Sequence, residues 1–367
     1  MIMKIKDITQ LLESWAPLAL QEPYDNAGLI TGNAEAELKG TLLCLDSTEA
    51  VVEEALSKGC NLIIAHHPIV FGGLKKFTGA NYVERTIIKA IKNDIAIYAI
   101  HTNLDNVYTG VNKKIADLLG LQNQRVLSPK KGGLKKLVTF CPTAHTTAVR
   151  EAICSAGAGH IGNYDFCTFN AEGTGTFRAG AATNPFVGEK GQLHSEPEVR
   201  IETVFPAYAQ GKVVQALLQA HPYEEPAYDL YTLDNVSQHV GAGMVGELNE
   251  ALAPQGFLAL LKKNMELNVI KHTAFTSAKV KTIAVCGGAG SFLLPDAIRA
   301  RADVFVTSDY KYHQFFDADN KIVIADVGHY ESEIFTTRLL AEQILKKIPT
   351  FVPIFSETVT NPVNYYY

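Results

Sequence analysis

Apolar runs alternate with amphipathic stretches in the first third of the chain and again near its C-terminus. The spacing of apolar positions predicts buried strands over 41–45, 61–65, 95–100, 280–286, 304–307 and 322–326. It predicts helices over 5–15, 49–58, 82–93, 111–119, 295–301 and 332–347. Strands that are apolar throughout and separated by helices are typical of a sheet buried on both faces. The two ends of the chain therefore predict α/β architecture.

The segment between these ends follows a different pattern. It begins at a break over 128–133, where a proline, two lysines and two glycines interrupt regular structure. Beyond the break we predict strands over 135–141, 164–171, 173–180, 199–206 and 226–233, helices over 145–156 and 208–220, and a loop over 184–197. The order β-α-β-β-β-α-β resembles a ferredoxin-like α+β sandwich with additions. We expect residues 1–129 and 236–367 to form one composite α/β domain, interrupted by an insertion over 130–235.

Histidines and carboxylates follow the apolar strands of both outer segments. The residues concerned, in chain order, are Asp46, His66, His67, His101, Asp105, Asp309, Asp326 and His329. In open α/β sheets ligands bind at the carboxyl ends of the strands, so we expect these side chains to share one site.

The residue types at this edge indicate a metal centre. His66 and His67 leave a strand together at Pro68, and His329 and Glu333 lie four apart, on one face of a predicted helix. Together with Asp105 they make five ligands, more than one zinc ion takes from a protein, so the set predicts two metal ions. Mixed imidazole and carboxylate ligands suit zinc, manganese, iron or cobalt.

Further residues at the same edge have open roles. His101 either ligates a metal or supports a ligand from behind. Asp46, Asp309 and His313 are candidates to orient ligands or to move protons. A purely structural role for all these histidines is disfavoured, because so many uncompensated polar groups at one buried edge would be costly.

Three other motifs have a structural and a functional interpretation. The glycine-rich turn over 286–291 could cradle an anion, but glycines required by a tight turn are favoured. The turn over 25–29 is interpreted as a structural turn near the site. The polar and aromatic segment 221–226 is either a ligand loop or a helix-to-strand connection, and the connection is favoured.

The amino-acid composition and charge argue against several classes of protein. Apolar residues make up 47% of the 367 residues and charged residues 19%, which excludes long disorder. The formal net charge of -5 argues against non-specific nucleic-acid binding. We expect no signal peptide, no membrane span and no membrane partner. Six scattered cysteines without a Cys-x-x-Cys pair predict free thiols and a cytoplasmic location.

Six motifs together resemble the Nif-three-like family, which is also labelled GTP cyclohydrolase 1 type 2 homologue. They are Tyr24–Leu29, His66–Pro68, His101–Asp105, Gly287–Ser291, Asp309–His313 and Gly328–Glu333. The resemblance implies a three-layer α/β domain and a dinuclear site carried by His66, His67, Asp105, His329 and Glu333. It further implies an insertion resembling PII and CutA proteins, and a toroidal homohexamer.

The leading functional hypothesis is a dinuclear metal-dependent hydrolase that acts on a nucleotide or a phosphorylated small molecule, with GTP ring opening as the form that the family label suggests. Two divalent metal ions are expected per chain, with zinc preferred, while His101, Asp309 or His313 serves as general acid or base. The alternative is a metal-binding or regulatory hexameric assembly protein without turnover. A DNA-binding ring is disfavoured by the acidic charge.

Overall fold

The computed structural model describes residues 2–366, which divide into two compact units. One unit joins the chain up to Pro129 to the chain from Gln238 onward, and the other is Lys130–Ser237. Within the described residues, the helices are all too short or too polar to cross a lipid bilayer.

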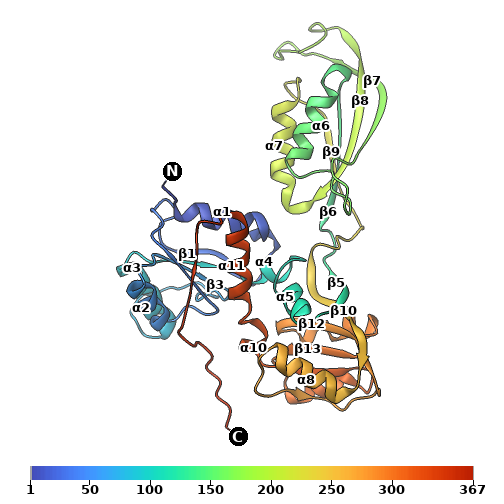
Figure 1. Ribbon diagram of the computed structural model, residues 1–367. Coiled ribbons are helices and arrows are strands. Elements are labelled where there is room, and N and C mark those ends of the chain that lie inside the picture. The colour runs from blue at the N-terminus through green and yellow to red at the C-terminus, as the bar shows by residue number, and fades with distance from the viewer. Residues whose placement is uncertain (1, 367) are drawn as a thin grey trace. The chain divides into compact units, whose positions relative to one another are not determined.

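The first sheet of the composite unit has the order β1-β4-β3-β2-β15. Its strands are β1 (Gly28–Thr31), β2 (Thr41–Cys44), β3 (Leu62–Ala65), β4 (Ala96–Ala99) and β15 (Ile354–Phe355). All neighbours run parallel except β1, which pairs antiparallel with β4 at the edge. Helices α2 (Glu49–Ser57) and α3 (Tyr82–Lys92) pack on one face, and α1 (Ile5–Trp15) and α11 (Thr336–Lys347) pack on the other (Figure 1). This double cover explains why β2, β3 and β4 are apolar and buried throughout.

The second sheet of this unit has the order β11-β14-β13-β12-β10-β5. Its strands are β5 (Gln122–Pro129), β10 (Gly241–Leu252), β11 (Lys271–His272), β12 (Val280–Ala289), β13 (Val304–Ser308) and β14 (Val323–Asp326). The central strands β12, β13 and β14 run parallel. Helix α9 (Leu294–Arg299) packs on one face, while α5 (Val111–Leu118) and α8 (Pro254–Asn264) pack on the other. One continuous core of buried side chains connects the two sheets, so they form a single unit.

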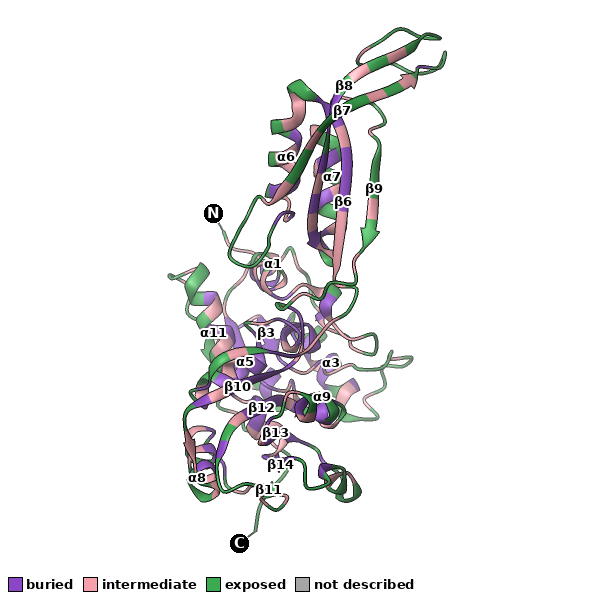
Figure 2. Cartoon of the chain, turned by 90° about the vertical axis from the view of Figure 1, so that its right-hand side faces the viewer, coloured by how far each residue is buried: buried purple, intermediate pink, exposed green. Residues whose placement is uncertain are grey.

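The unit Lys130–Ser237 is a four-stranded antiparallel sheet with two helices on one face (Figures 1 and 2). Its elements, in chain order, are β6 (Leu134–Pro142), α6 (Thr146–Ser155), β7 (Thr168–Arg178), β8 (Leu193–Pro206), α7 (Gln210–Ala220) and β9 (Tyr228–Thr232). The strand order is β7-β8-β6-β9. Alternate side chains, such as Leu137 on β6 and Val199 and Ile201 on β8, form the core with Val149 of α6 and Val213 of α7.

The expected mixture of helices and several sheets is confirmed, but two predictions of individual elements are wrong and some elements were not predicted. The segments 164–171 and 173–180 are not two strands around a turn, because β7 runs continuously through Gly173 and pairs with β8 along its whole length. The expected loop over 184–197 is too long, since β8 begins at Leu193. The pattern also gave no sign of β10, because glycines such as Gly246 interrupt its apolar run.

Gly246 lies in β10 for a steric reason. A Cβ atom at Gly246 would lie 2.9 Å from the carbonyl oxygen of Gln122 at the start of β5. Close approach of the neighbouring strand therefore requires a glycine, even though glycine weakens the sequence signal for a strand.

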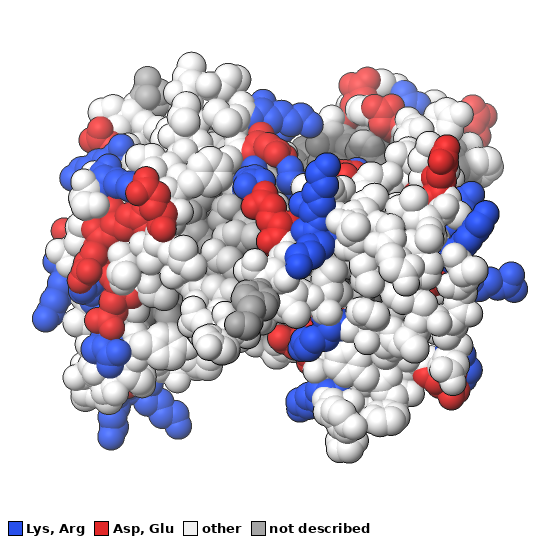
Figure 3. Space-filling view, turned by 60° about the horizontal axis from the view of Figure 1, so that its bottom comes forward, with Lys and Arg blue, Asp and Glu red and all other residues white. Residues whose placement is uncertain are grey.

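Charged side chains of both signs lie close together on the face shown in Figure 3. Lysine and arginine side chains alternate there with aspartate and glutamate. The described part of this face thus lacks the uniform positive field that attracts a nucleic-acid backbone.

The C-terminal segment is attached to the first sheet through a carboxylate on α2. The carboxylate of Glu54 accepts hydrogen bonds from the backbone N–H groups of Glu357 (2.7 Å) and Thr358 (3.2 Å) and from the hydroxyl of Thr358 (2.7 Å). Although burial raises the pKa of Glu54, these bonds and the neighbouring Lys58 lower it to about 2. The segment that follows β15 is thereby held against α2.

We expect Glu54→Gln to lower the thermal unfolding temperature at pH 7 by about 2–4 °C, because charge-assisted hydrogen bonds are lost. A depressed pKa stabilises the fold above the unfolded-state value near 4.5, and this contribution is lost as the pH falls from there toward about 2. The difference between wild type and variant should therefore shrink below pH 4.5 in a series of unfolding curves. Glu53→Gln on the exposed side of α2 is the control, and an equal effect of both variants would contradict this role of Glu54.

Candidate metal centre

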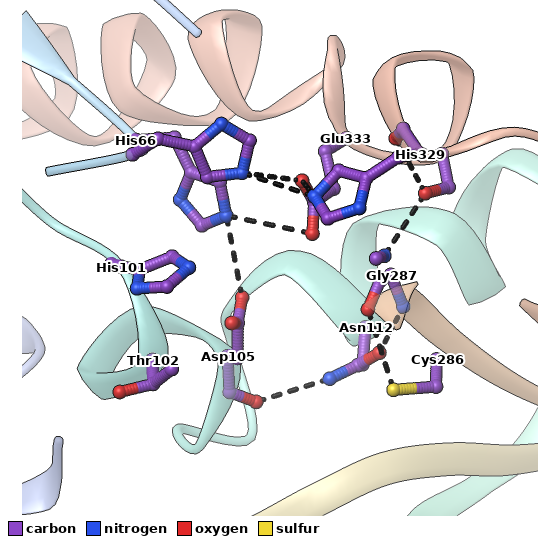
Figure 4. A network of polar contacts seen from close by, with 12 residues as sticks. His66, His101, Thr102, Asp105, Asn112, Cys286, Gly287, His329 and Glu333 are labelled. Carbon is purple, nitrogen blue, oxygen red and sulfur yellow. Dashed lines mark hydrogen bonds and ion pairs between the residues drawn. The ribbon is translucent and has the colours of Figure 1, made fainter. Parts of the chain in front are cut away.

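The two sheets of the composite unit bring their strand ends to one cluster of histidines and carboxylates (Figure 4). His66 and His67 follow β3 directly, and His101 follows β4. Asp105 ends the short helix α4 (Thr102–Asp105). The second sheet contributes α10 (His329–Glu333), which starts just after β14. Residues that are far apart in the sequence thus meet because parallel strands end at the same edge.

One part of the cluster has three ligand atoms around a buried position. The Nδ1 atom of His66 lies 2.8 Å from the carbonyl oxygen of Ile100, which only accepts, so Nδ1 carries the proton and Nε2 has a free lone pair. This Nε2 lies 3.7 Å from Oδ1 of Asp105 and 3.8 Å from Oε1 of Glu333. Both His66 Nε2 and Asp105 Oδ1 are buried without a hydrogen-bond partner. Buried polar atoms without partners are costly, and a cation between them would satisfy both.

The other oxygen of Glu333 belongs to a second group of ligand atoms. Oε2 of Glu333 lies 2.9 Å from Nε2 of His67 and 3.0 Å from Nε2 of His329. The two imidazole Nε2 atoms are 3.2 Å apart. His67, His329 and Glu333 therefore form a set that could hold a metal ion. Since Glu333 offers one oxygen to each group, its side chain links the two sets.

Outer carboxylates fix the orientation of three of the four imidazoles. Asp46 lies 2.7 Å from Nδ1 of His67, and Asp309 lies 2.7 Å from Nδ1 of His329. A carboxylate at Nδ1 holds the proton there and leaves Nε2 directed at the cluster, which is how metal-ligating histidines are usually oriented.

The third outer carboxylate is Asp25, which the sequence did not single out. It lies 2.8 Å from Nδ1 of His101 and accepts a hydrogen bond of 3.0 Å from the backbone N–H of Thr102. These bonds outweigh the effect of burial and lower the pKa of Asp25 to about 2. The turn over 25–29 was interpreted as a structural turn near the site, and the signal was that the motif 24–29 is among those that resemble the family. A ligand atom of His101 lies within 4.8 Å of those of His66 and His67.

Among the described residues at this edge, carboxylates outnumber side chains with a permanent positive charge. Burial and the nearby Glu333 raise the pKa of Asp105 to about 7. Burial alone would lower the pKa of His67 and His329, but hydrogen bonds to Glu333 and to the outer carboxylates raise it to about 10 and about 9. Protons on these imidazoles therefore compensate a buried negative charge, and a divalent cation would serve the same purpose.

The remaining predicted residues lie around the cluster. Asp309 is half exposed, and its contact with the site among the described residues is with His329. His313 is exposed in the 3-10 helix η5 (Tyr312–Ala318), where its ring contacts Tyr312 and Phe316. Among the described contacts, none connects His313 to the cluster.

The glycine-rich turn after β12 is a structural support for the cluster. Its backbone N–H groups donate to side chains of the protein: Gly287 to Asn112, Gly288 to Ser332 and Gly290 to Thr307, each at 3.0 Å. These donors are already used within the fold, so the interpretation as a tight turn holds and the anion cradle does not.

Comparisons with known proteins agree with the fold. The family model described as Duf34/NIF3 (NGG1p interacting factor 3) matches residues 3–362. A protein of Halalkalibacterium halodurans named GTP cyclohydrolase 1 type 2 homolog is 43% identical over 89% of this chain and 88% of its own length. A Bacillus subtilis protein of the same name is 38% identical over 98% of both chains. The crystal structure of a Bacillus cereus protein related to NIF3 covers 100% of both chains with 40% identity and a TM-score of 0.86.

Metal binding to this cluster should release protons. The pKa values of His67 and His329 lie above neutral pH, so both imidazoles must lose a proton before their Nε2 atoms can ligate. We expect the affinity for Zn²⁺ to rise between pH 6 and pH 8, with roughly one to two protons released per chain. Calorimetric titration of chelator-treated protein in buffers of different ionisation heat measures this number, and binding that is independent of pH without proton release would refute the prediction.

Gly288 should be essential for the shape of the cluster. It has a φ of +62°, and a Cβ atom there would lie 2.4 Å from Oε1 of Glu333. We expect Gly288→Ala to displace this carboxylate and to lower metal affinity at least about tenfold. Gly120→Ala is the control, because Gly120 has a similar φ of +69° but open space around it. Equal metal affinity of the two variants in a chelator-competition titration would show that the contact is unimportant.

Proposed function

This chain belongs to the Duf34/NIF3 family, and on that premise we propose that it is a dinuclear metal-dependent hydrolase acting on a nucleotide or a phosphorylated small molecule. The observation that supports this most is the side chain of Glu333, which offers its two oxygens to two separate groups of ligands. The relatives named GTP cyclohydrolase 1 type 2 homolog make GTP the first substrate to examine.

In this proposal each group of ligands holds one divalent ion. His66, Asp105 and Oε1 of Glu333 would bind the first, and His67, His329 and Oε2 of Glu333 the second. Zinc is the preferred ion, because three histidine and carboxylate ligands are typical of a zinc site that keeps one position open. Two such ions, when bound, supply an activated water and stabilise charged oxygens of the substrate.

We assign the proton transfer to His101. Asp25 holds a proton on Nδ1 of His101, so Nε2 is left to accept a proton from a substrate or a water. The backbone N–H of Thr102 donates a hydrogen bond to the other oxygen of Asp25, and this fixes the orientation of the carboxylate and hence of the imidazole. Asp309 and Asp46 act at a distance in this scheme, by keeping His329 and His67 oriented.

The proposal extends to the organisation of the protein. We propose that 1–129 and 236–367 form one three-layer domain and that 130–235 is a ferredoxin-like insertion of the PII/CutA kind, within a homohexamer. The βαββαβ order of the insertion and its strand order support the ferredoxin-like assignment. All six cysteines are free thiols, which fits a reducing cytoplasmic location.

The proposal predicts that Glu333→Gln loses both metal binding and turnover. We expect wild-type protein, purified without chelators, to contain about two equivalents of metal per chain and to consume GTP in a metal-dependent manner. Glu333→Gln should retain the fold but bind less than about half of this metal and show no turnover, because the linking carboxylate is neutralised. Plasma mass spectrometry and chromatography of the nucleotide products measure the two quantities.

Glu331→Gln is the matched control, since Glu331 lies on the same helix and its carboxylate accepts from Asn361 instead of facing the cluster. Full metal content and turnover in Glu333→Gln would refute the proposed centre. Two metal ions without turnover of GTP or of a panel of phosphorylated compounds would favour the regulatory assembly protein.

A further inference from the structure

The unit Lys130–Ser237 contains a cavity of about 740 Å³, which belongs to a different part of the chain from the metal centre. It lies on the face of the sheet that α6 and α7 leave uncovered. Phe140 and Arg200 pair directly in the register of β6 and β8, and they alternate with Cys141 and Val199, which face the helices. The segment 179–186 and the segment 223–227 form its walls.

Two glycines of β7 leave space above the sheet in this cavity. A Cβ atom at Gly173 would meet nothing within 4 Å. At Gly175 a Cβ atom would lie 2.0 Å from Oε2 of Glu198, so only glycine leaves room for that carboxylate. Glycines in the middle of a strand weaken it, and here they open a space above the sheet.

Glu198 places a carboxylate in this space. The residue is only 9% exposed, and its Oε1 accepts a hydrogen bond of 2.8 Å from the hydroxyl of Tyr223. Oε2 lies over Gly175 without a hydrogen-bond partner among the described residues. This oxygen is open to the cavity, and the one hydrogen bond that the carboxylate accepts comes from a neutral donor, so a cation at Oε2 would stabilise it.

Aromatic rings line the same cavity. The ring centroids of Phe177 and Phe186 lie 6.0 Å and 6.4 Å from that of Tyr223, whose hydroxyl donates to Glu198. The faces of such rings attract cations and also bury apolar groups. Backbone contacts fix the walls, since the N–H of Asn184 donates to the carboxylate of Glu224 at 2.8 Å.

The charges around the cavity favour the same kind of ligand. Its charged lining residues include Glu198, Glu224, Glu225 and Arg200. Glu172 and Arg178 also line it, but they alternate along β7 with Gly173 and Phe177 and so point to the opposite face of the sheet. Arg200 is already paired with Glu202 at 2.8 Å. The cavity therefore has an excess of negative charge together with apolar walls.

We infer that this cavity binds a small organic cation with an aromatic body, of the arylalkyl-ammonium class. The ammonium group contacts Oε2 of Glu198, and the ring lies among Phe177, Phe186 and Tyr223. Segment 221–226 is then both a helix-to-strand connection and part of a ligand site.

Tryptamine, tryptophol and indole-3-acetate test this inference, because they share the indole ring and differ mainly in the charge of the side chain. Titration calorimetry on the full chain should give an affinity for tryptamine at least about tenfold higher than for tryptophol, and weaker binding still for indole-3-acetate. Equal affinities for the three compounds, stronger binding of the acetate, or no binding of tryptamine would overturn the inference.

Two variants locate the site. Glu198→Gln keeps an acceptor for Tyr223 and should weaken tryptamine at least about tenfold while leaving tryptophol unchanged. Gly173→Val fills the floor with a strand-favouring side chain and should abolish binding of both compounds. Glu151→Gln, the same charge change on the exposed side of α6, is the control and should bind as wild type.

Unfolding curves establish that each variant is folded. Tryptamine affinity that is the same in wild type, Glu198→Gln and Gly173→Val would place the ligand elsewhere and refute the site. The metal content of these variants should equal that of wild type, so this experiment can fail without any bearing on the proposed hydrolase.

Discussion

The burial of the Glu333 carboxylate is the constraint on which the composite unit depends. Its side chain is 4% exposed and lies among three imidazoles from two different sheets. A buried carboxylate is stable only when positive charge surrounds it, and in this chain that charge comes from protonated imidazoles or from metal. The ends of β3 and β14 therefore have to lie next to Glu333, so that the histidines that follow both strands contact its carboxylate.

The requirement extends beyond the direct contacts. Asn112 of α5 donates to the carbonyl oxygen of Asp105 at 3.1 Å and accepts from the N–H of Gly287 at 3.0 Å, so one amide connects α4 of the first sheet to β12 of the second. Thr360 donates to the second oxygen of Asp46 at 2.7 Å, which brings the C-terminal segment into contact with the support of His67. Hydrogen bonds at the site thus connect the two sheets, and the two sheets in turn position the residues of the site.

Much of this arrangement could be predicted from the sequence, because histidines and carboxylates at the ends of apolar strands must gather at one edge. The role of Asp25 could not, since it depends on a loop that crosses to His101 from 76 residues upstream. Glycine caused the errors in the fold. The glycine-rich pattern of β7 was interpreted as two strands around a turn, with Gly173 at the start of the second strand. The glycines of β10 concealed a strand, because the close approach that requires Gly246 is visible only in three dimensions.

Burying a carboxylate is costly, and two buried carboxylates of this chain are compensated in different ways. Glu333 is compensated within the protein, since His67 and His329 both lie within hydrogen-bonding distance of one oxygen and His66 lies near the other. The hydrogen bond that Glu198 accepts among the described residues comes from the neutral hydroxyl of Tyr223, and its second oxygen opens onto a cavity with aromatic walls. A carboxylate with internal cations can organise a fold without a ligand, whereas one without them depends on a cation from outside. Among the described hydrogen bonds, Glu198 accepts none from an imidazole, and this difference gives the second unit the features of a ligand site.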